Sequence, residues 1–399
     1  MQDVYDFWAQ RISGDRLGQI EAMWTRFAEN ARQIDEARRA GATSAGALSQ
    51  IMASVLGPLG AELEWSFAAG PAGAGTQTLV LSAGARHDRR VLARAVLDNA
   101  PDLRGWAFAE TRPPVGDAVG APEEISARDN GRRLSLLGIE AEPGQHRRID
   151  LIPRGNGDAA EQARQAALAF EVLLGEDKAR DWLGLHEPRK KGLLGRLAGG
   201  RGGGSGGRWC EPLRDTCWRL IAQMRENVPP RPFAEQPYDR NAYVMYQAMR
   251  LEQDPAWRND TITGYTSYRA MAHARMAGDP MAAERFSRFG EAFCGLKVAR
   301  TPDFPFGETE QRTALAEGAH LMLSTHEQGG VTGEAVGHAH VYVDLALTDV
   351  SGGLETLAEL LDRIELNGPA WLIFDEAGLK EYAVPLTPRT PAVPRPSYK

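Results

Sequence analysis

The sequence predicts an α+β protein with two domains, each built on ββαβ sheet units, joined by a glycine-rich linker. Three observations support this fold class. The chain has 399 residues, more than one hydrophobic core usually organises. Residues 199–207 contain seven glycines and a serine, a composition that sustains neither helix nor strand. Segments with strand and helix periodicity follow one another in the order β-β-α-β on both sides of that run.

The N-terminal domain is expected to span residues 1–188. Apolar residues at helical spacing indicate helices over 4–37, with a break at Ser13-Gly14-Asp15, and over 44–57. A first unit follows, with strands 63–68 and 77–82, a helix over 89–99 and a strand over 105–110. Five aromatic residues at helix or strand spacing are expected in its core rather than in a ligand-stacking set: Trp8, Trp24, Phe27, Trp106 and Phe108.

A second unit is expected after a Pro/Gly-rich loop over 113–130. Its predicted elements are strands 133–140 and 147–152, a helix over 159–174 and a short strand over 182–187. Two successive ββαβ units predict an antiparallel or mixed sheet with its helices packed on one side. This arrangement is ferredoxin-like in the broad sense.

Residues 189–208 form the predicted flexible Gly/Arg-rich linker. We interpret its basic residues as a solvated segment, with contact to an acidic partner as the alternative. These residues are Arg189, Lys190, Lys191, Arg196, Arg201 and Arg208.

The C-terminal domain is expected over 209–386, before a Pro-rich tail at 387–399. Its first part, from Trp209 to about Cys294, is expected to be mainly helical. The predicted elements after it are a helix over 308–318, strands 321–325 and 337–347, a helix over 355–365 and a strand over 370–375. The order β-β-α-β thus appears a third time.

Composition narrows the class of protein. The net charge of −7 argues against a broad nucleic-acid footprint. Three cysteines are too few for a disulfide framework and suit a reducing cytoplasm. The sequence has neither a signal-peptide pattern nor the roughly 20 consecutive apolar residues of a membrane helix. We therefore expect a cytoplasmic protein that binds neither nucleic acid nor membrane.

One group of residues has side chains suited to metal binding or acid–base chemistry. Because alternate strand residues share a face, the predicted strand 337–347 places His338, His340, Tyr342 and Asp344 together. Imidazoles and a carboxylate can bind a transition metal or act as acid and base near neutral pH. The same face is also interpreted as solvent-exposed polar surface, as a face covered by the region 209–294, or as a partner-binding surface.

Other motifs are weak. The junction Ser82–Asp88 passes from strand to helix and can bind an anion, but it lacks a Walker or dinucleotide pattern. Gly329–Gly333 is interpreted as a turn between strands. The sequence contains no Gly-x-Ser-x-Gly, Walker A or His-Glu-x-x-His motif, and no histidine follows His340. These patterns indicate no catalytic residue and no cofactor.

Two segments resemble known bacterial proteins. Pro302–Asp344 combines an acidic helix with Glu308, Glu310 and Glu317, a glycine-rich connection, and a strand ending in aromatic and acidic residues. It is similar to the small ferredoxin-like domains grouped with regulator of ribonuclease activity B. Trp24–Asn30 and the strand Leu79–Ser82 resemble stand-alone bacterial proteins of unknown function. The resemblance implies protein-binding regulators or immunity-type proteins rather than enzymes.

The sequence therefore favours a non-enzymatic bacterial protein that binds another protein. The alternative is a metal-dependent enzyme or sensor that uses His338, His340 and Asp344.

Overall fold

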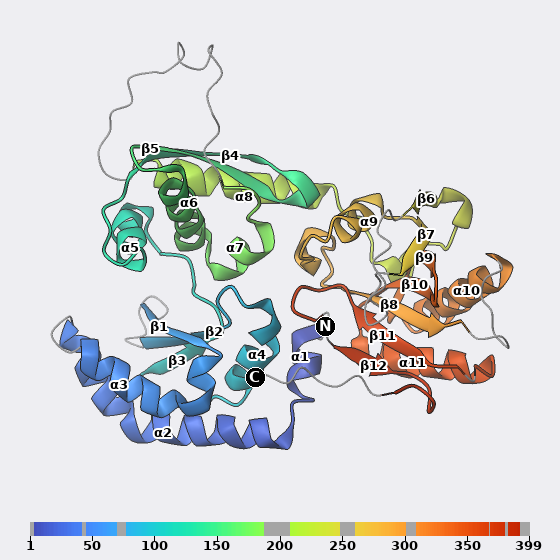
Figure 1. Cartoon of the computed structure of the whole chain (residues 1–399), viewed down its shortest axis with the longest axis horizontal. Coiled ribbons are helices and arrows are strands. Elements are labelled where there is room, and N and C mark those ends of the chain that lie inside the picture. The colour runs from blue at the N-terminus through green and yellow to red at the C-terminus, as the bar shows by residue number, and fades with distance from the viewer. Residues whose placement is uncertain are drawn as a thin grey trace, which may run out of the picture. The chain divides into compact units, whose positions relative to one another are not determined.

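The computed structural model describes residues 4–41, 45–69, 77–186, 208–247, 260–300, 309–366, 368–379 and 382–391 (Figure 1). The chain divides into two compact bodies. The small body consists of Tyr5–Gly116 with Glu171–Arg180, and the large body contains Asp117–Phe170 and the chain from Asp181 onward. Helices and strands occur in both bodies, so the chain is α+β, as predicted.

The small body combines α-helices with a three-stranded sheet of order β1-β2-β3. β1 and β2 pair antiparallel, whereas β2 and β3 pair parallel and are connected through α4. The predicted first unit occurs within one or two residues of its expected bounds. The elements are α1 (Val4–Ala9), α2 (Gly14–Arg39), α3 (Ala45–Leu56), β1 (Glu64–Ala69), β2 (Gln77–Ser82), α4 (Arg90–Asp98) and β3 (Trp106–Ala109).

Aromatic packing holds the helices on this sheet. Trp24 and Phe27 of α2 contact Phe108 of β3 edge-on, with ring centroids 4.6 and 5.5 Å apart, and Phe27 also contacts Trp106. The Trp24 indole N–H donates to the carbonyl of Val96 in α4 at 2.9 Å. The core interpretation of these aromatic residues is confirmed: Trp8, Trp24 and Phe27 are buried, and Trp106 and Phe108 are partly buried against the core that contains Trp24 and Phe27.

The large body begins with a two-stranded antiparallel hairpin and the helices around it. α8 packs against β4 and against η4, a short 3₁₀ helix over Ala118–Gly120. The predicted loop over 113–130 thus contains a helix, α5, and the predicted strand 182–187 is reduced to a single bridge between Leu183 and Ile149. The elements are α5 (Ala121–Arg128), β4 (Leu136–Pro143), β5 (Ile149–Gly155), α6 (Ala159–Leu174) and α8 (Cys210–Glu226). Most of α7 (Glu176–Trp182) belongs to the small body.

The main sheet of the large body has seven strands in the order β12-β11-β8-β10-β9-β7-β6, all antiparallel. Its elements are β6 (Val244–Gln247), β7 (Thr261–Thr266), α9 (Arg269–Met276), β8 (Ala292–Ala299), α10 (Thr309–Thr325), β9 (Gly329–Gly337), β10 (His340–Leu347), α11 (Val350–Arg363), β11 (Ala370–Phe374) and β12 (Ala383–Pro385).

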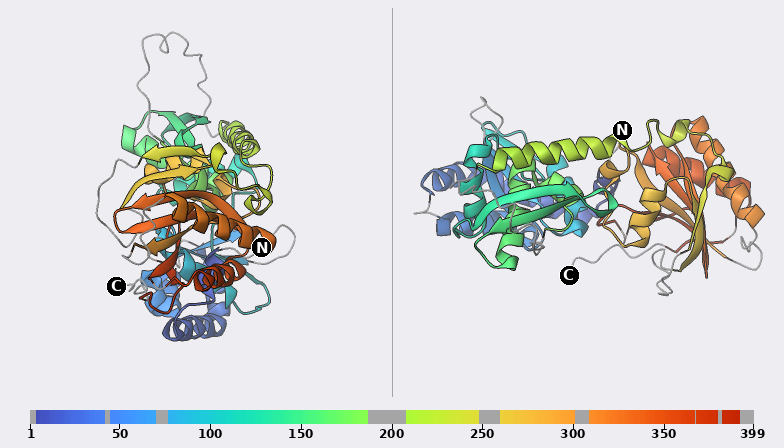
Figure 2. Two further views of the ribbon diagram at one scale, coloured as in Figure 1. Left: turned by 90° about the vertical axis from the view of Figure 1, so that its right-hand side faces the viewer. Right: turned by 90° about the horizontal axis from the view of Figure 1, so that it is seen from above.

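Helices cover both faces of this sheet. α10 and α11 pack on the face that carries Val341 and Leu347, and α9 lies on the opposite face (Figures 1 and 2). Consequently every residue of the central strand β10 is buried. An antiparallel strand covered on both sides does not show the alternation between apolar and solvent-exposed residues that the sequence analysis assumed.

The region 209–294 is not mainly helical, so this prediction is wrong. Only α8 and the alanine-rich segment that forms α9 are α-helices among its described residues, which also include β6, β7 and the start of β8. Cys294 accordingly lies in a strand instead of a helix. The strands gain their stability from pairing with β9, β10 and β11, a non-local interaction that local propensity does not report.

The segment 321–333 also differs from its prediction. The expected strand 321–325 is the last part of α10, and the expected turn Gly329–Gly333 lies within β9. Glycine is required in this strand because other backbone approaches it. A Cβ atom at Gly330 would lie 2.2 Å from the carbonyl oxygen of Phe233, and one at Gly333 would lie 2.6 Å from that of Tyr265.

The two bodies do not divide at the predicted boundary near residue 188. β4 and β5 precede that point and α8 follows it, yet all three belong to the large body because they pack together. Arg148 also forms an ion pair with Asp279 at 2.7 Å. The predicted linker lies outside the described residues except for Arg208, as does the predicted tail from residue 392. Within the described ranges, no helix has both the length and the apolar character needed to cross a membrane.

Candidate functional site

The β9–β10 hairpin positions the four residues singled out in the sequence. His340, Tyr342 and Asp344 lie on β10 and point to the face covered by α9, whereas His338 lies in the exposed hairpin turn before the strand. Tyr342 is flanked by Lys297 of β8 and Ala335 of β9. The polar face is thus buried, which corresponds to the covered-face interpretation and not to an open strand surface.

Asp260, directly before β7, binds the start of this strand. Its carboxylate accepts hydrogen bonds from the backbone N–H of Ala339 at 2.9 Å and from the hydroxyl of Tyr342, and it lies 3.2 Å from Nδ1 of His340. Its carbonyl oxygen accepts from the backbone N–H of His338 at 3.1 Å. Burial alone would raise the pKa of Asp260, but the bonds from His340, Tyr342 and Ala339 together hold it well below its usual range.

Asp344 belongs to a separate ion-pair cluster. Arg275 of α9 donates to Asp344 at 3.0 Å and to Asp375, which follows β11, through two nitrogens. Both carboxylates are almost completely buried. Burial would lower the pKa of Arg275, but the two carboxylates outweigh it and raise that pKa, so the guanidinium remains charged. This cluster attaches α9 to the sheet.

The structure therefore does not bring the proposed metal ligands together. His340 and Asp344 are four residues apart on one extended strand, a separation of about 13 Å, whereas ligands of one metal ion lie within about 2.5 Å of it. They bind different partners, Asp260 and Arg275. In the part of the chain that is described, no three His, Cys, Asp or Glu side chains are grouped so that they could hold a metal ion.

Glu334 and His320, two further residues with side chains able to bind a metal, do not join this face. Glu334 of β9 projects to the opposite face, where Arg240 and Arg312 contact one of its carboxylate oxygens at 3.0 and 3.4 Å. His320 lies on α10, and its Nδ1 accepts a hydrogen bond from the backbone N–H of Val331. Burial lowers the pKa of His320. These contacts connect α10 to the sheet.

Asp260 and Arg275 are central to these clusters, although no sequence pattern points to either of them. Each is far from β10 in sequence, 82 positions between Asp260 and Tyr342 and 69 between Arg275 and Asp344. Neither has a local motif that would have identified it. Their partners follow only from the strand order and from the placement of α9.

A second surface of interest surrounds α8. Large apolar side chains are exposed on three elements that pack together: Val119 on η4 is 79% exposed, Leu137 on β4 55% and Trp218 on α8 42%. α8 buries its other apolar side, including Leu213 and Ile221. We call Val119, Leu137 and Trp218 the α8 surface. Single exposed apolar residues are ordinary, and it is larger exposed apolar patches that mark interaction sites.

Comparisons of the chain with protein-family models, with curated proteins and with solved structures give no match.

Proposed function

We propose that this chain is a non-enzymatic protein that acts by binding another protein, in a regulatory or immunity-type role as its sequence resemblance implies. The α8 surface carries the proposal. Trp218 offers the large, partly exposed aromatic side chain that most often dominates binding energy at protein interfaces. By contrast, the polar residues of β10 are engaged in internal hydrogen bonds and ion pairs.

We further propose that residues 292–374 form a ferredoxin-like unit. Two observations support this reading. The elements β8, α10, β9, β10, α11 and β11 follow one another in β-α-β-β-α-β order. Their strands lie in the order β11-β8-β10-β9, and α10 and α11 pack against one another on one face.

The test compares two variants in affinity purification from the native host. Trp218→Ser removes the aromatic side chain of the α8 surface. Gln223→Ser is the matched control, since Gln223 is also exposed on α8 and is replaced by the same residue. Loss of an interfacial tryptophan typically reduces the binding free energy by at least about 2 kcal/mol, so the affinity for a partner should fall roughly 30-fold.

The proposal predicts a protein that co-purifies with the wild type and with Gln223→Ser but is depleted with Trp218→Ser. Its affinity for the three purified chains is then measured by calorimetry. A set of co-purifying proteins that is identical for all three chains would show that this surface has no partner. Circular dichroism of each variant verifies that the fold is unchanged.

A further inference from the structure

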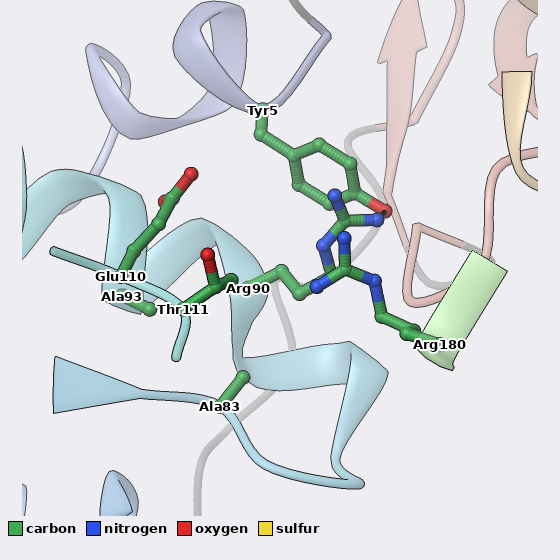
Figure 3. Close-up of a pocket in the computed structure, with 7 residues that line it drawn as sticks. All are labelled: Tyr5, Ala83, Arg90, Ala93, Glu110, Thr111 and Arg180. Carbon is green, nitrogen blue, oxygen red and sulfur yellow. Dashed lines mark hydrogen bonds between the residues drawn. The ribbon is translucent and has the colours of Figure 1, made fainter. Parts of the chain in front are cut away.

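The small pocket beside α4 has room for only one water-sized group (Figure 3). A reaction between neighbouring groups of the chain itself needs no pocket, and Asn-Gly pairs can undergo one. The backbone nitrogen of the glycine attacks the side-chain amide carbon of the asparagine, and glycine hinders this approach least because it has no Cβ atom. The sequence contains Asn-Gly at 130–131, 156–157 and 367–368, of which Asn367 lies outside the described residues. Asn130 and Asn156 are both exposed and both belong to the large body.

The pair Asn130-Gly131 ends the helix α5. Asn130 has a φ of 58° and Gly131 a φ of 73°, both in the left-handed region. The N–H of Gly131 donates to the carbonyl of Ser126 at 2.9 Å, which is the hydrogen bond that closes a helix end of this kind. The nitrogen that could attack Asn130 is therefore engaged, and this turn has to open before the pair reacts.

The pair Asn156-Gly157 lies in the turn between β5 and α6 and is held at other atoms. The N–H of Asn156 donates to the carbonyl of Ser135 at 3.0 Å, and the carbonyl of Gly157 accepts from the side chain of Gln162 at 2.6 Å. Among the described residues, neither the N–H of Gly157 nor the side-chain amide of Asn156 has a hydrogen-bond partner. The attacking nitrogen and the amide group are thus both accessible in the native turn.

We propose that Asn156 is a site of spontaneous deamidation in the folded protein. The nitrogen of Gly157 forms a bond to Cγ of Asn156, the bond from Cγ to the amide nitrogen breaks, and the proton of the Gly157 N–H leaves with that nitrogen as ammonia. The resulting succinimide takes up one water molecule and opens to aspartate or isoaspartate. The reaction needs only water as a co-reactant.

Either product changes the beginning of α6. The new carboxylate adds a negative charge close to Asp158, whose side chain accepts from the backbone N–H of Glu161 at 2.7 Å in the first turn of the helix. Isoaspartate also inserts a methylene group into the main chain between the hydrogen bond to Ser135 and Asp158. Deamidation therefore alters the connection between the β4–β5 hairpin and α6.

The experiment incubates the full chain at pH 8, native and in guanidinium chloride, and follows its tryptic peptides by mass spectrometry. Trypsin releases Asn156 in the peptide 155–164 and Asn130 in the peptide 129–132. Deamidation raises the mass of a peptide by about 1 Da, the difference between an NH2 and an OH group. We expect folding to slow Asn130 roughly threefold to tenfold more than Asn156, because only Gly131 must first break a hydrogen bond.

A variant assigns the reaction to Asn156. The peptide 155–164 also contains Gln162, so Asn156→Ser should abolish the mass increase of this peptide and leave the rate at Asn130 unchanged. Labelling by isoaspartyl methyltransferase should fall in the same variant, and circular dichroism verifies its fold. The proposal is overturned if the native peptide 155–164 gains no mass while the denatured one does, or if folding slows Asn156 as much as Asn130.

Discussion

Replacing Asp260 by alanine removes the carboxylate that holds the start of β10. Three donors lose their acceptor: the backbone N–H of Ala339, Nδ1 of His340 and the hydroxyl of Tyr342. The backbone carbonyl of residue 260 remains and still accepts from His338. We expect this variant to destabilise the large body without changing its fold.

The size of this destabilisation depends on whether the groups that lose their acceptor are buried. Ala339 is exposed, so water replaces the lost acceptor there, whereas His340 and Tyr342 are buried and each lose a hydrogen bond to a charged group. A hydrogen bond to a charged group is worth about 1.5–3 kcal/mol. The two buried contacts together predict a loss of about 3–6 kcal/mol in the free energy of unfolding. For a domain of this size, that lowers the melting temperature by roughly 6–24 °C.

Differential scanning calorimetry measures the melting transition of the large body, and urea denaturation gives the free energy of unfolding. Tyr342→Phe removes one of the two buried contacts and should cost about 1.5–3 kcal/mol. In the double variant, Tyr342→Phe should add little to Asp260→Ala, since both remove the same hydrogen bond. A loss below about 1 kcal/mol for Asp260→Ala, or full additivity in the double variant, would refute this reasoning.

The same carboxylate predicts a pH dependence. The pKa of Asp260 is lower in the folded than in the unfolded chain, where it is about 3.9. Its contribution to stability is therefore complete above about pH 4 and decreases as the pH falls toward the folded-state pKa. The stability difference between wild type and Asp260→Asn should shrink between about pH 4 and pH 2. A difference that stays constant over this range contradicts the assigned shift.

Two further predictions concern buried groups. Arg275→Met leaves its two aspartate partners buried without a cation and should cost about 3–5 kcal/mol at pH 8. Because burial then raises the folded-state pKa of both carboxyls, the stability difference between the wild type and Arg275→Met should shrink as the pH falls. A stability difference that urea denaturation finds independent of pH would contradict this expectation. Burial raises the pKa of Cys210 to about 11 and that of Cys217 to about 12. Ellman's reagent at pH 8 should therefore label both thiols much faster in urea than in the native protein, and equal rates would disprove their burial.

The sequence predicted the small body more accurately than the large one. β1, β2, α4 and β3 lie close to their expected bounds because each has a local signal, either strand alternation or helical spacing. β9 was missed because most of its residues are small or glycine. Glycine is required where neighbouring backbone lies too close for a side chain, as at Gly330, and strand propensity does not reflect this requirement.

The polar residues of β10 also show which contacts a sequence cannot predict. The sequence alone determined that His340, Tyr342 and Asp344 share one strand face, because side-chain alternation is a property of any extended backbone. It could not determine that α9 covers this face, or that Asp260 and Arg275 bind two different parts of it. Those contacts join residues about 70 to 80 positions apart. Only the strand order and the helix packing decided that these polar residues stabilise the sheet, since contacts between distant segments leave no periodic signal in the sequence.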